Sequence, residues 1–504
     1  MMHTLTSPAG PTRWYFRLGA GALLGAWNRH KPILVGLIFI LGLMAGLFSW
    51  NRSEFFGPDA VYYFGRFLHG WPDLIRAFVA IDDRGHYRPM GLVMFTYLFF
   101  PLFGYNPPGH HLVPLVFHAV NTVLAYLIAR RLLPSPVAAL AVAFVFALHR
   151  VNFFVTYGIT FIPDFTGAFF LLSAFFAYLK SERNDRWIAI AYVSWIASVL
   201  SKESAVFLPA ILTSYEVMRS NEERVSRRLW ASAKQTAIFW GLALLFIGAI
   251  WFMRGGALYP DSAAHPYRAS LSLESAVMKV KYLWWGLNLP QGTGMASFFV
   301  SGVPGLSVPI KPAYPRLTTA AALLMFPVII VFLAFVGRAI RRLHRASLLG
   351  LIWFLLALAP VLPLAGKVMQ HNLYIPLLGV ALLAGVFVSE VVRTKFKYVL
   401  APAMAIFVFS TFTGVLNNRV NSWPVTSSRT SARLLKEFHA AIPGGFDCGT
   451  ALLVGVPENS DLIWYTDSGN LFRVFGPCRD LKVYFHSSGV RPEFERVVQI
   501  QLSP

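Results

Sequence analysis

Long apolar runs separated by short polar segments make up most of the chain. The first run, residues 32–50, is long enough to cross a bilayer as a helix. Four basic residues and no acidic residue precede it, without a small-residue cleavage site, so we interpret it as an uncleaved anchor with a cytoplasmic N-terminus. We expect further spans near residues 109–133, 137–149, 163–180, 187–200, 205–218, 230–252, 317–337, 348–364, 373–392 and 398–416. The pattern predicts an all-α polytopic membrane protein with about eleven transmembrane helices.

The basic residues support this count, because Lys and Arg gather in the cytoplasmic loops of membrane proteins. With the N-terminus inside, every even-numbered span ends in the cytoplasm. Each of these ends is basic: Arg130–Arg131, Lys180 with Arg183, Arg219 to Arg228, Arg338 to Arg345, and Arg393 to Lys397. A miscount by one helix would place basic clusters on both sides of the membrane.

The opposite loops hold the acidic residues and most of the long insertions. Two apolar stretches in them, residues 90–105 and 272–289, are interpreted as helices in or near the outer interface, since counting 90–105 as a span would invert every later loop. The chain thus divides into a cytoplasmic segment 1–31, a transmembrane part 32–416 with large outer loops 51–108 and 254–316, and a tail 417–504.

The tail alternates short apolar runs with polar turns. Residues 428–442 have helical spacing, and the runs at 451–456, 462–465, 483–485 and 497–500 are typical of strands. We therefore predict a small extracytoplasmic α/β domain. Both cysteines, Cys448 and Cys478, lie in it, and a disulfide between them is the natural expectation outside the cytoplasm.

Composition agrees with the bilayer as the main solvent. Hydrophobic residues make up 56% of the chain and charged residues 13%, whereas about a quarter of a soluble protein is charged. The 44 Lys and Arg exceed the 23 Asp and Glu, but the excess lies in short loops between apolar spans. This distribution favours a membrane protein over a nucleic-acid partner.

Candidate chemistry gathers in the predicted outer loops. Lys202–Glu203 joins two apolar spans, where a turn would more often use Gly, Asn or Ser and where charges are costly to desolvate. Asp164 begins another span, where a carboxylate also suits a helix N-terminus. Asp82–Asp83 could be a solvated pair. The remaining candidates are Asp59, Arg88, His149, Lys367 and His371, and an isolated histidine is more often structural than functional.

These residue types suit the transfer of a sugar from a lipid phosphate to a hydroxyl group. The reaction needs a carboxylate to accept the hydroxyl proton and cations to stabilise the departing phosphate. Asp59 or Asp164 could be the base, and Lys202, Arg88, His371 and Lys367 could supply positive charge. A basic lining at the lipid interface would suit a phosphate headgroup.

Several motifs resemble a known family in order and spacing. They are Tyr87-Arg88-Pro89-Met90, Phe103 to Pro107, His111-Leu112-Val113, His118-Ala119-Val120-Asn121, Phe146 to His149, Leu200 to Ser204, and Leu373-Tyr374-Ile375-Pro376. Together they resemble the transmembrane O-mannosyltransferase-like proteins of bacteria and eukaryotes, which belong to the GT-C superfamily of glycosyltransferases. The resemblance covers about residues 59–376.

This resemblance implies an inverting enzyme that uses a polyprenyl-phosphate sugar at the extracytoplasmic face. By motif it implies Asp59 as the base, Asp164 as a second acid and Lys202 as a phosphate contact, with Glu203, His149 and Tyr374 in support. Pro58 replaces the first of two adjacent family acids, so Asp82 or Asp83 remains an alternative base. His371 stands where an Arg is usual, Arg150 replaces a proline, and tetratricopeptide repeats are lacking.

We therefore expect a glycosyltransferase of a bacterial inner membrane, acting on a protein, glycolipid or polysaccharide acceptor outside the cytoplasm. Its expected partners are a polyprenyl-phosphate sugar and membrane lipid, without nucleic acid. We assign no cofactor and no metal ligands, although Asp82–Asp83 could bind a divalent ion. The alternative is a transporter of lipid-linked saccharides or solutes. Transporters usually place ionisable groups near the bilayer midplane, and here these groups lie at the span ends. A catalytically inactive scaffold would tolerate loss of the outer charges.

Overall fold

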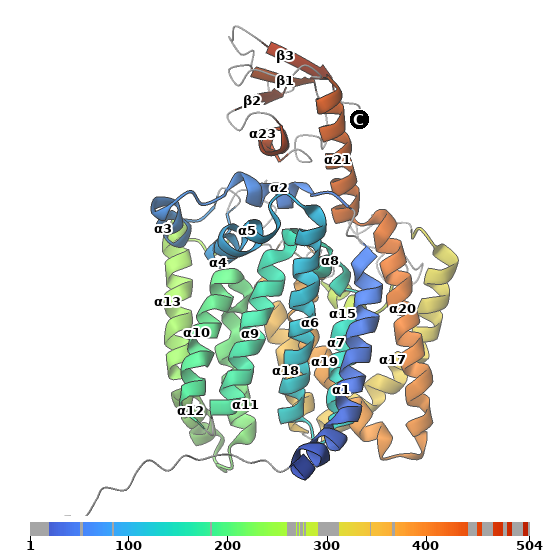
Figure 1. Ribbon diagram of the computed structural model, residues 1–504. Coiled ribbons are helices and arrows are strands. Elements are labelled where there is room, and N and C mark those ends of the chain that lie inside the picture. The colour runs from blue at the N-terminus through green and yellow to red at the C-terminus, as the bar shows by residue number, and fades with distance from the viewer. Residues whose placement is uncertain are drawn as a thin grey trace, which may run out of the picture.

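The computed structural model describes residues 20–50, 54–82, 85–181, 184–259, 269, 272, 276, 279–290, 312–342, 344–364, 368–441, 451–455, 467–476, 481–485 and 497–501. Helices dominate, and most of them run side by side in one bundle (Figure 1).

A helix lies in each of the eleven ranges predicted to span the membrane. These are α1 (Ala20–Phe48), α6 (Pro107–Leu132), α7 (Pro136–Leu148), α9 (Ile162–Ser181), α10 (Arg186–Ser201), α11 (Leu208–Arg219), α13 (Ala237–Met253), α17 (Pro315–Arg341), α18 (Arg345–Leu358), α19 (Leu377–Val392) and α20 (Leu400–Asn421). Among described residues, five helices are long and apolar enough to cross a membrane, or six if α13 and α12 (Val225–Gln235), which meet at 67°, form one bent span. The multi-pass membrane class is confirmed, and the number of crossings stays a prediction.

Short helices cover the end of the bundle that the sequence assigns to the outside. They are α2 (Pro58–Gly65), α3 (Trp71–Val79), α4 (Pro89–Met94), the π-helix Phe95–Phe99, α5 (Phe100–Phe103), α8 (Asn152–Tyr157) and α15 (Val280–Gly286). The stretch 90–105, which we predicted to stay near the outer interface, forms α4, the π-helix and α5. These elements lie at the upper end of the bundle beside α2 and α3 (Figure 1).

Buried polar groups join the helices of the bundle core. The Tyr374 hydroxyl, which is fully buried, lies 2.8 Å from His118 Nδ1 and accepts a hydrogen bond from Asn121 Nδ2 at 3.1 Å. Asn121 Nδ2 also donates to the carbonyl oxygen of Phe165 at 3.1 Å. Two of the sequence motifs, on α6 and just before α19, thus meet in the interior. Buried polar groups need such partners, so these motif residues specify how the helices pack.

Beyond α20 the chain continues into α21 (Trp423–Ala441), which begins five residues before the predicted helix. Strands β1 (Ala451–Gly455), β2 (Lys482–Phe485) and β3 (Val497–Gln501) form a parallel sheet in the order β2-β1-β3, and α23 (Asn470–Phe475) lies between β1 and β2 in sequence. Three predicted strands are therefore present. The predicted strand 462–465 and both Cys448 and Cys478 lie outside the described residues, and the boundary of the tail as a domain stays a prediction.

Close backbone contact between α18 and α19 gives a test of the core. A Cβ atom added at Gly379 would lie against the carbonyl oxygen of Gly350 and 2.7 Å from the backbone nitrogen of Phe354. Overpacking of this kind costs about 1–3 kcal/mol. We expect Gly379→Ala to lower the free energy of unfolding of the purified protein by that amount, as measured by thermal unfolding. Gly337→Ala in α17, where nothing lies within 4 Å, should leave stability unchanged or slightly raised. Equal stabilities for the two variants would contradict the packing.

Candidate active site

A cavity of about 1210 Å³ opens at the outer end of the bundle, beneath α2 and α3. Seven of the predicted site residues line this cavity: Asp59, Asp82, Arg88, Asp164, Lys202, Glu203 and His371. They come from segments more than 300 residues apart in the sequence. The fold thus brings the principal candidates together.

The deepest charged contact joins Lys202 to Asp164. Asp164 is the third residue of α9, and Lys202 ends α10, so the pair lies where these two helices meet. Lys202 Nζ donates to Asp164 Oδ1, and the two side chains are only 9% and 7% exposed. A Cβ atom at Gly167 would lie 2.9 Å from the Lys202 Cβ, so glycine at this position permits the close approach of α9 and α10.

A second ion pair joins two sequence motifs. Arg88 Nε donates to Glu203 Oε2 at 2.8 Å, and the backbone nitrogen of Tyr87 donates to Glu203 Oε1 at 3.3 Å. Burial works to raise the pKa of Glu203, but the Arg88 guanidinium and His86 outweigh it and lower that pKa below its usual value. Glu203 therefore stays ionised and holds Arg88 at the cavity wall.

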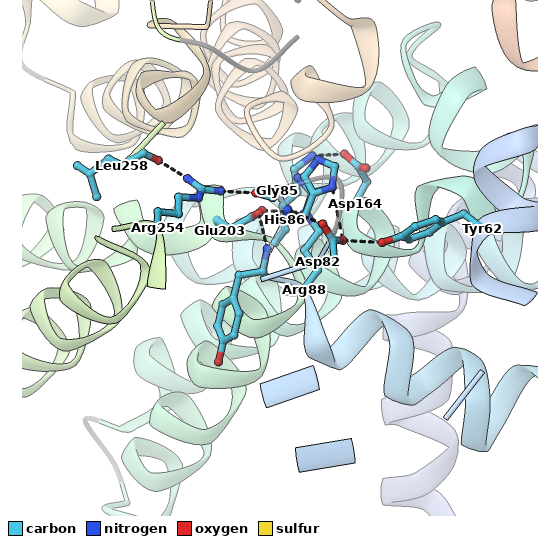
Figure 2. A network of polar contacts seen from close by, with 11 residues as sticks. Tyr62, Asp82, Gly85, His86, Arg88, Asp164, Glu203, Arg254 and Leu258 are labelled. Carbon is cyan, nitrogen blue, oxygen red and sulfur yellow. Dashed lines mark hydrogen bonds and ion pairs between the residues drawn. The ribbon is translucent and has the colours of Figure 1, made fainter. Parts of the chain in front are cut away.

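Asp82, Gly85 and His86 lie beside this pair, and the backbone nitrogen of Gly85 donates to the carbonyl oxygen of Asp82 at 2.9 Å, which makes a turn (Figure 2). Asp82 accepts a hydrogen bond from the Tyr62 hydroxyl at 2.9 Å and another from the backbone nitrogen of His86 at 2.6 Å. From the other side, Arg254 Nη2 donates to the carbonyl oxygen of Gly85 at 2.6 Å, which fastens the turn to the end of α13. The turn is thus held by residues from two other segments, α2 and the end of α13.

The electrostatics of Asp82 bear on the choice of base. Burial would raise the pKa of Asp82, but its hydrogen bonds with His86 and Tyr62 and the charge of His86 lower it from 3.8 to about 2. A carboxylate of such low pKa is a poor proton acceptor. The low pKa therefore counts against Asp82 as the base. Asp59, the second residue of α2, also lines the cavity.

The other predicted residues lie elsewhere or outside the described chain. His371 lines the cavity and packs its ring on Phe161, with 5.1 Å between centroids. His149 is buried against α15, with Nε2 3.3 Å from the carbonyl oxygen of Gly286, and neither it nor Tyr374 lines the cavity. Their described contacts are those of packing residues. Asp83 and Lys367 lie outside the described residues.

Several cavity residues were missed by sequence reasoning. Arg254 follows α13 on the predicted outer side, where the charge rule makes an arginine unusual, so that signal was available. Tyr63 lies one turn after Asp59 on α2 and Arg66 directly follows that helix, but α2 is too short to be recognised by periodicity. Asp467 and Ser468 come from the tail, and no local pattern places them at this cavity.

The charge balance differs from the expected basic lining. Among the described residues of the cavity there are five Lys or Arg and six Asp or Glu, with two histidines. The prediction of a net basic lining is therefore wrong for the described part of the cavity: Lys202 and Arg88 each lie against a carboxylate. Within the same part of the chain no group of three or more His, Cys, Asp or Glu could hold a metal ion.

Solved structures of membrane glycosyltransferases share this fold. ArnT from Cupriavidus metallidurans bound to undecaprenyl phosphate superposes with a TM-score of 0.50 at 12% identity, covering 92% of this chain and 91% of ArnT. The Archaeoglobus fulgidus oligosaccharyltransferase tethered to an acceptor peptide gives 0.50 at 14% identity, covering 91% of this chain and 64% of that protein. The chain thus shares the fold of these two proteins.

Sequence comparison is consistent with this fold. Residues 87–251, about a third of the chain, match the family model described as dolichyl-phosphate-mannose-protein mannosyltransferase. The protein O-mannosyl-transferase Tmtc1 of Drosophila melanogaster is 32% identical over 126 residues, which are 25% of this chain and 15% of Tmtc1. TMTC3 of Homo sapiens is 28% identical over 143 residues, which are 27% of this chain and 15% of TMTC3. The match thus spans a small part of these relatives, and the predicted resemblance to O-mannosyltransferase-like proteins is confirmed.

The buried pair gives a stability prediction. Removing one member of a buried ion pair leaves the other charged and without compensation, at a cost of about 3–5 kcal/mol. Lys202→Met should therefore lower the free energy of unfolding strongly. The double variant Asp164→Asn with Lys202→Met should cost clearly less than the sum of the two single variants. Unfolding of the four proteins in detergent measures this, and simple additivity would contradict the pairing.

The turn at Asp82 gives a pH prediction. A carboxyl whose pKa is lower in the folded protein stabilises it above its unfolded pKa and loses that effect as the pH falls through the folded value. The difference in melting temperature between the wild type and Asp82→Asn should be constant from about pH 5 to pH 8. It should shrink as the pH falls from 3.8 towards 2. A difference that shrank already between pH 7 and 5 would contradict the low pKa.

Proposed function

We propose that the protein is an inverting glycosyltransferase that moves a sugar from a polyprenyl-phosphate donor to a hydroxyl group of an acceptor outside the cytoplasm. The observation that carries this proposal is the cavity at the outer end of the bundle, where Asp59, Asp164, Lys202 and Arg88 meet. The family match and the GT-C fold support the same reaction class.

Different segments give the cavity apolar and polar lining residues. Phe246, Ile247 and Ile250 come from α13, and Val361 and Leu364 come from the segment after α18. Asp59 and Tyr62 come from α2, and Arg66 follows that helix. Because an isoprenoid chain prefers apolar surface, we assign the donor lipid to α13 and the segment after α18, and the acceptor to the α2 segment.

In this proposal Asp59 is the general base. It accepts the proton of the acceptor hydroxyl as the hydroxyl oxygen attacks the anomeric carbon of the donor sugar. The bond between that carbon and the phosphate oxygen breaks, and the polyprenyl phosphate leaves with the electron pair. A single displacement of this kind inverts the configuration of the anomeric carbon. The leaving phosphate is already stable as an anion, so no strong general acid is required.

Lys202 and Arg88 hold the donor phosphate in this proposal, and His371 lies on the same cavity. Each of the two cations already has a carboxylate partner, so the phosphate must share them with Asp164 and Glu203. The phosphate diester of the donor carries one negative charge, and the departing monoester carries more. Its attraction to the two cations therefore grows as the reaction proceeds, which is the requirement for electrostatic catalysis.

The location follows from the same assignment. In this proposal the cavity and the tail lie outside the cytoplasm and the N-terminus lies inside, in a bacterial inner membrane, and the loop charges support this orientation. The named relatives are protein O-mannosyl-transferases, so a mannosyl donor and a protein hydroxyl form the first pair to test, with glycolipid and polysaccharide acceptors after it.

Turnover of the donor tests the function. We expect the purified protein in lipid nanodiscs to release polyprenyl phosphate from polyprenyl-phosphate mannose in the presence of acceptor. Asp59→Asn should lower kcat by about 10²–10⁴-fold, because it removes the general base. Asp59→Asn with Asp164→Asn should abolish transfer.

Asp185→Asn, at the exposed start of α10, is the matched control and should keep full activity. Melting temperatures of all variants show whether they are folded. Normal turnover by the folded double variant would refute the assignment of the site.

A further inference from the structure

Helix α2, which carries Asp59, is enclosed at both ends by the tail. A Cβ atom added at Gly57, before the helix, would lie 3.2 Å from the hydroxyl oxygens of Ser427 and Ser428 on α21. One added at Gly65, at its end, would lie 3.3 Å from Asn470 Nδ2 at the start of α23. Both glycines thus allow tail elements more than 350 residues later in the sequence to approach α2 closely.

An aromatic cluster fixes α23 on the same helix. The ring of Phe475 lies 5.2 Å from that of Phe55, 5.8 Å from Phe56, 5.7 Å from Phe64 and 5.5 Å from Tyr105, measured between centroids. Aromatic pairs at these separations contribute beyond the area that they bury. Figure 1 shows α23 directly above α2, between the bundle and the small sheet.

An ion pair adds to this contact on the α21 side. Arg429 Nη2 donates to Glu54 Oε1 at 2.8 Å, just before α2 begins. The tail is therefore attached to the α2 segment through an aromatic cluster, two close glycine contacts and one ion pair.

The tail also contributes directly to the cavity. Asp467 and Ser468 line it, and they adopt left-handed backbone conformations with φ of 48° and 55°. Two such residues in succession are costly unless the surroundings hold them. Gly469 follows with φ of 90°, and a Cβ atom there would lie 2.8 Å from Val483 on β2, so the sheet supports the turn. Asp467 accepts a hydrogen bond from Asn470 Nδ2 at 3.0 Å, while the Ser468 side chain is exposed.

We propose that the tail is a working part of the active site. Its α23 holds α2, and therefore Asp59, in position, and its turn 467–469 forms the wall against which the acceptor is placed. This inference rests on the proposed function. The turn lines the cavity together with α2, the segment assigned to the acceptor, whereas α13 and the segment after α18 are assigned to the donor lipid. Phe475 is thus a positioning residue for Asp59, and Ser468 is one for the acceptor.

Steady-state kinetics on the full chain tests whether the turn 467–469 forms the wall against which the acceptor is placed. Ser468→Trp adds bulk at the turn and should raise the KM for the acceptor at least tenfold, while the KM for the donor and its slow hydrolysis without acceptor stay within twofold. Ser226→Trp, on exposed α12 near the other end of the bundle, is the matched control. An unchanged acceptor KM in Ser468→Trp would overturn this part of the proposal.

Hydrogen exchange tests the positioning of α2 without any substrate. Phe475→Ala should increase exchange of the α2 amides, residues 58–65, at least fivefold, and should lower kcat for transfer by a similar factor. Phe475→Leu, which keeps an apolar side chain, should restore most of both. Phe396→Ala, at an exposed phenylalanine far from the tail, should change neither.

The two outcomes separate the inference from the proposed function. Equal exchange of α2 in the wild type and in Phe475→Ala would overturn the positioning role, whatever the activity. Absence of donor turnover in the wild type would refute the proposed function, and the exchange result would still decide whether the tail holds α2.

Discussion

The site depends on the pairing of buried charges at the end of a helical bundle. Lys202 and Asp164 are removed from water at the junction of α9 and α10, where an unpartnered charge would be costly. Arg88 and Glu203 form the next pair along the same wall. Each carboxylate holds its cation in place before any ligand arrives. The same pairing sets a condition on function, because a donor phosphate must share these cations with the carboxylates that hold them.

Three parts of the molecule form the cavity around these pairs: the helical bundle, the short segments at its outer end, and the tail. The bundle supplies Asp164, Lys202 and Glu203 together with apolar residues, α2 supplies Asp59, and the segment between α3 and α4 supplies Asp82 and Arg88. The turn at Asp467 and Ser468 from the tail completes the lining. Since Phe475 packs on residues of the α2 segment, the position of Asp59 depends on an element from the far end of the chain. In this proposal the tail thus takes part in the site.

The parts of this structure that could be predicted from sequence were those set by local patterns. The apolar runs predicted helices, and the structure has a helix in each predicted range. The order of the motifs grouped Arg88, Asp164, Lys202 and Glu203 as candidate site residues, and all four line one cavity. Patterns could not show that Tyr374 and His149 are packing residues, since burial depends on which helices meet. Sequence patterns also could not predict the numbers of acidic and basic residues in the cavity. Asp73 and Asp467 both line it, but they come from segments that share no sequence signal. The packing of α23 on α2 depends on aromatic contacts between residues far apart in the sequence, and residue spacing does not predict such contacts.

Structure determination of the protein with a bound polyprenyl-phosphate sugar, or with the polyprenyl phosphate alone, tests the central claim most directly. The account predicts the phosphate within hydrogen-bond distance of both Lys202 and Arg88. It places the isoprenoid chain along Phe246, Ile250 and Val361 and the anomeric carbon towards Asp59. A phosphate bound away from Lys202 and Arg88, or an isoprenoid chain lying against α2 and the tail, would contradict it.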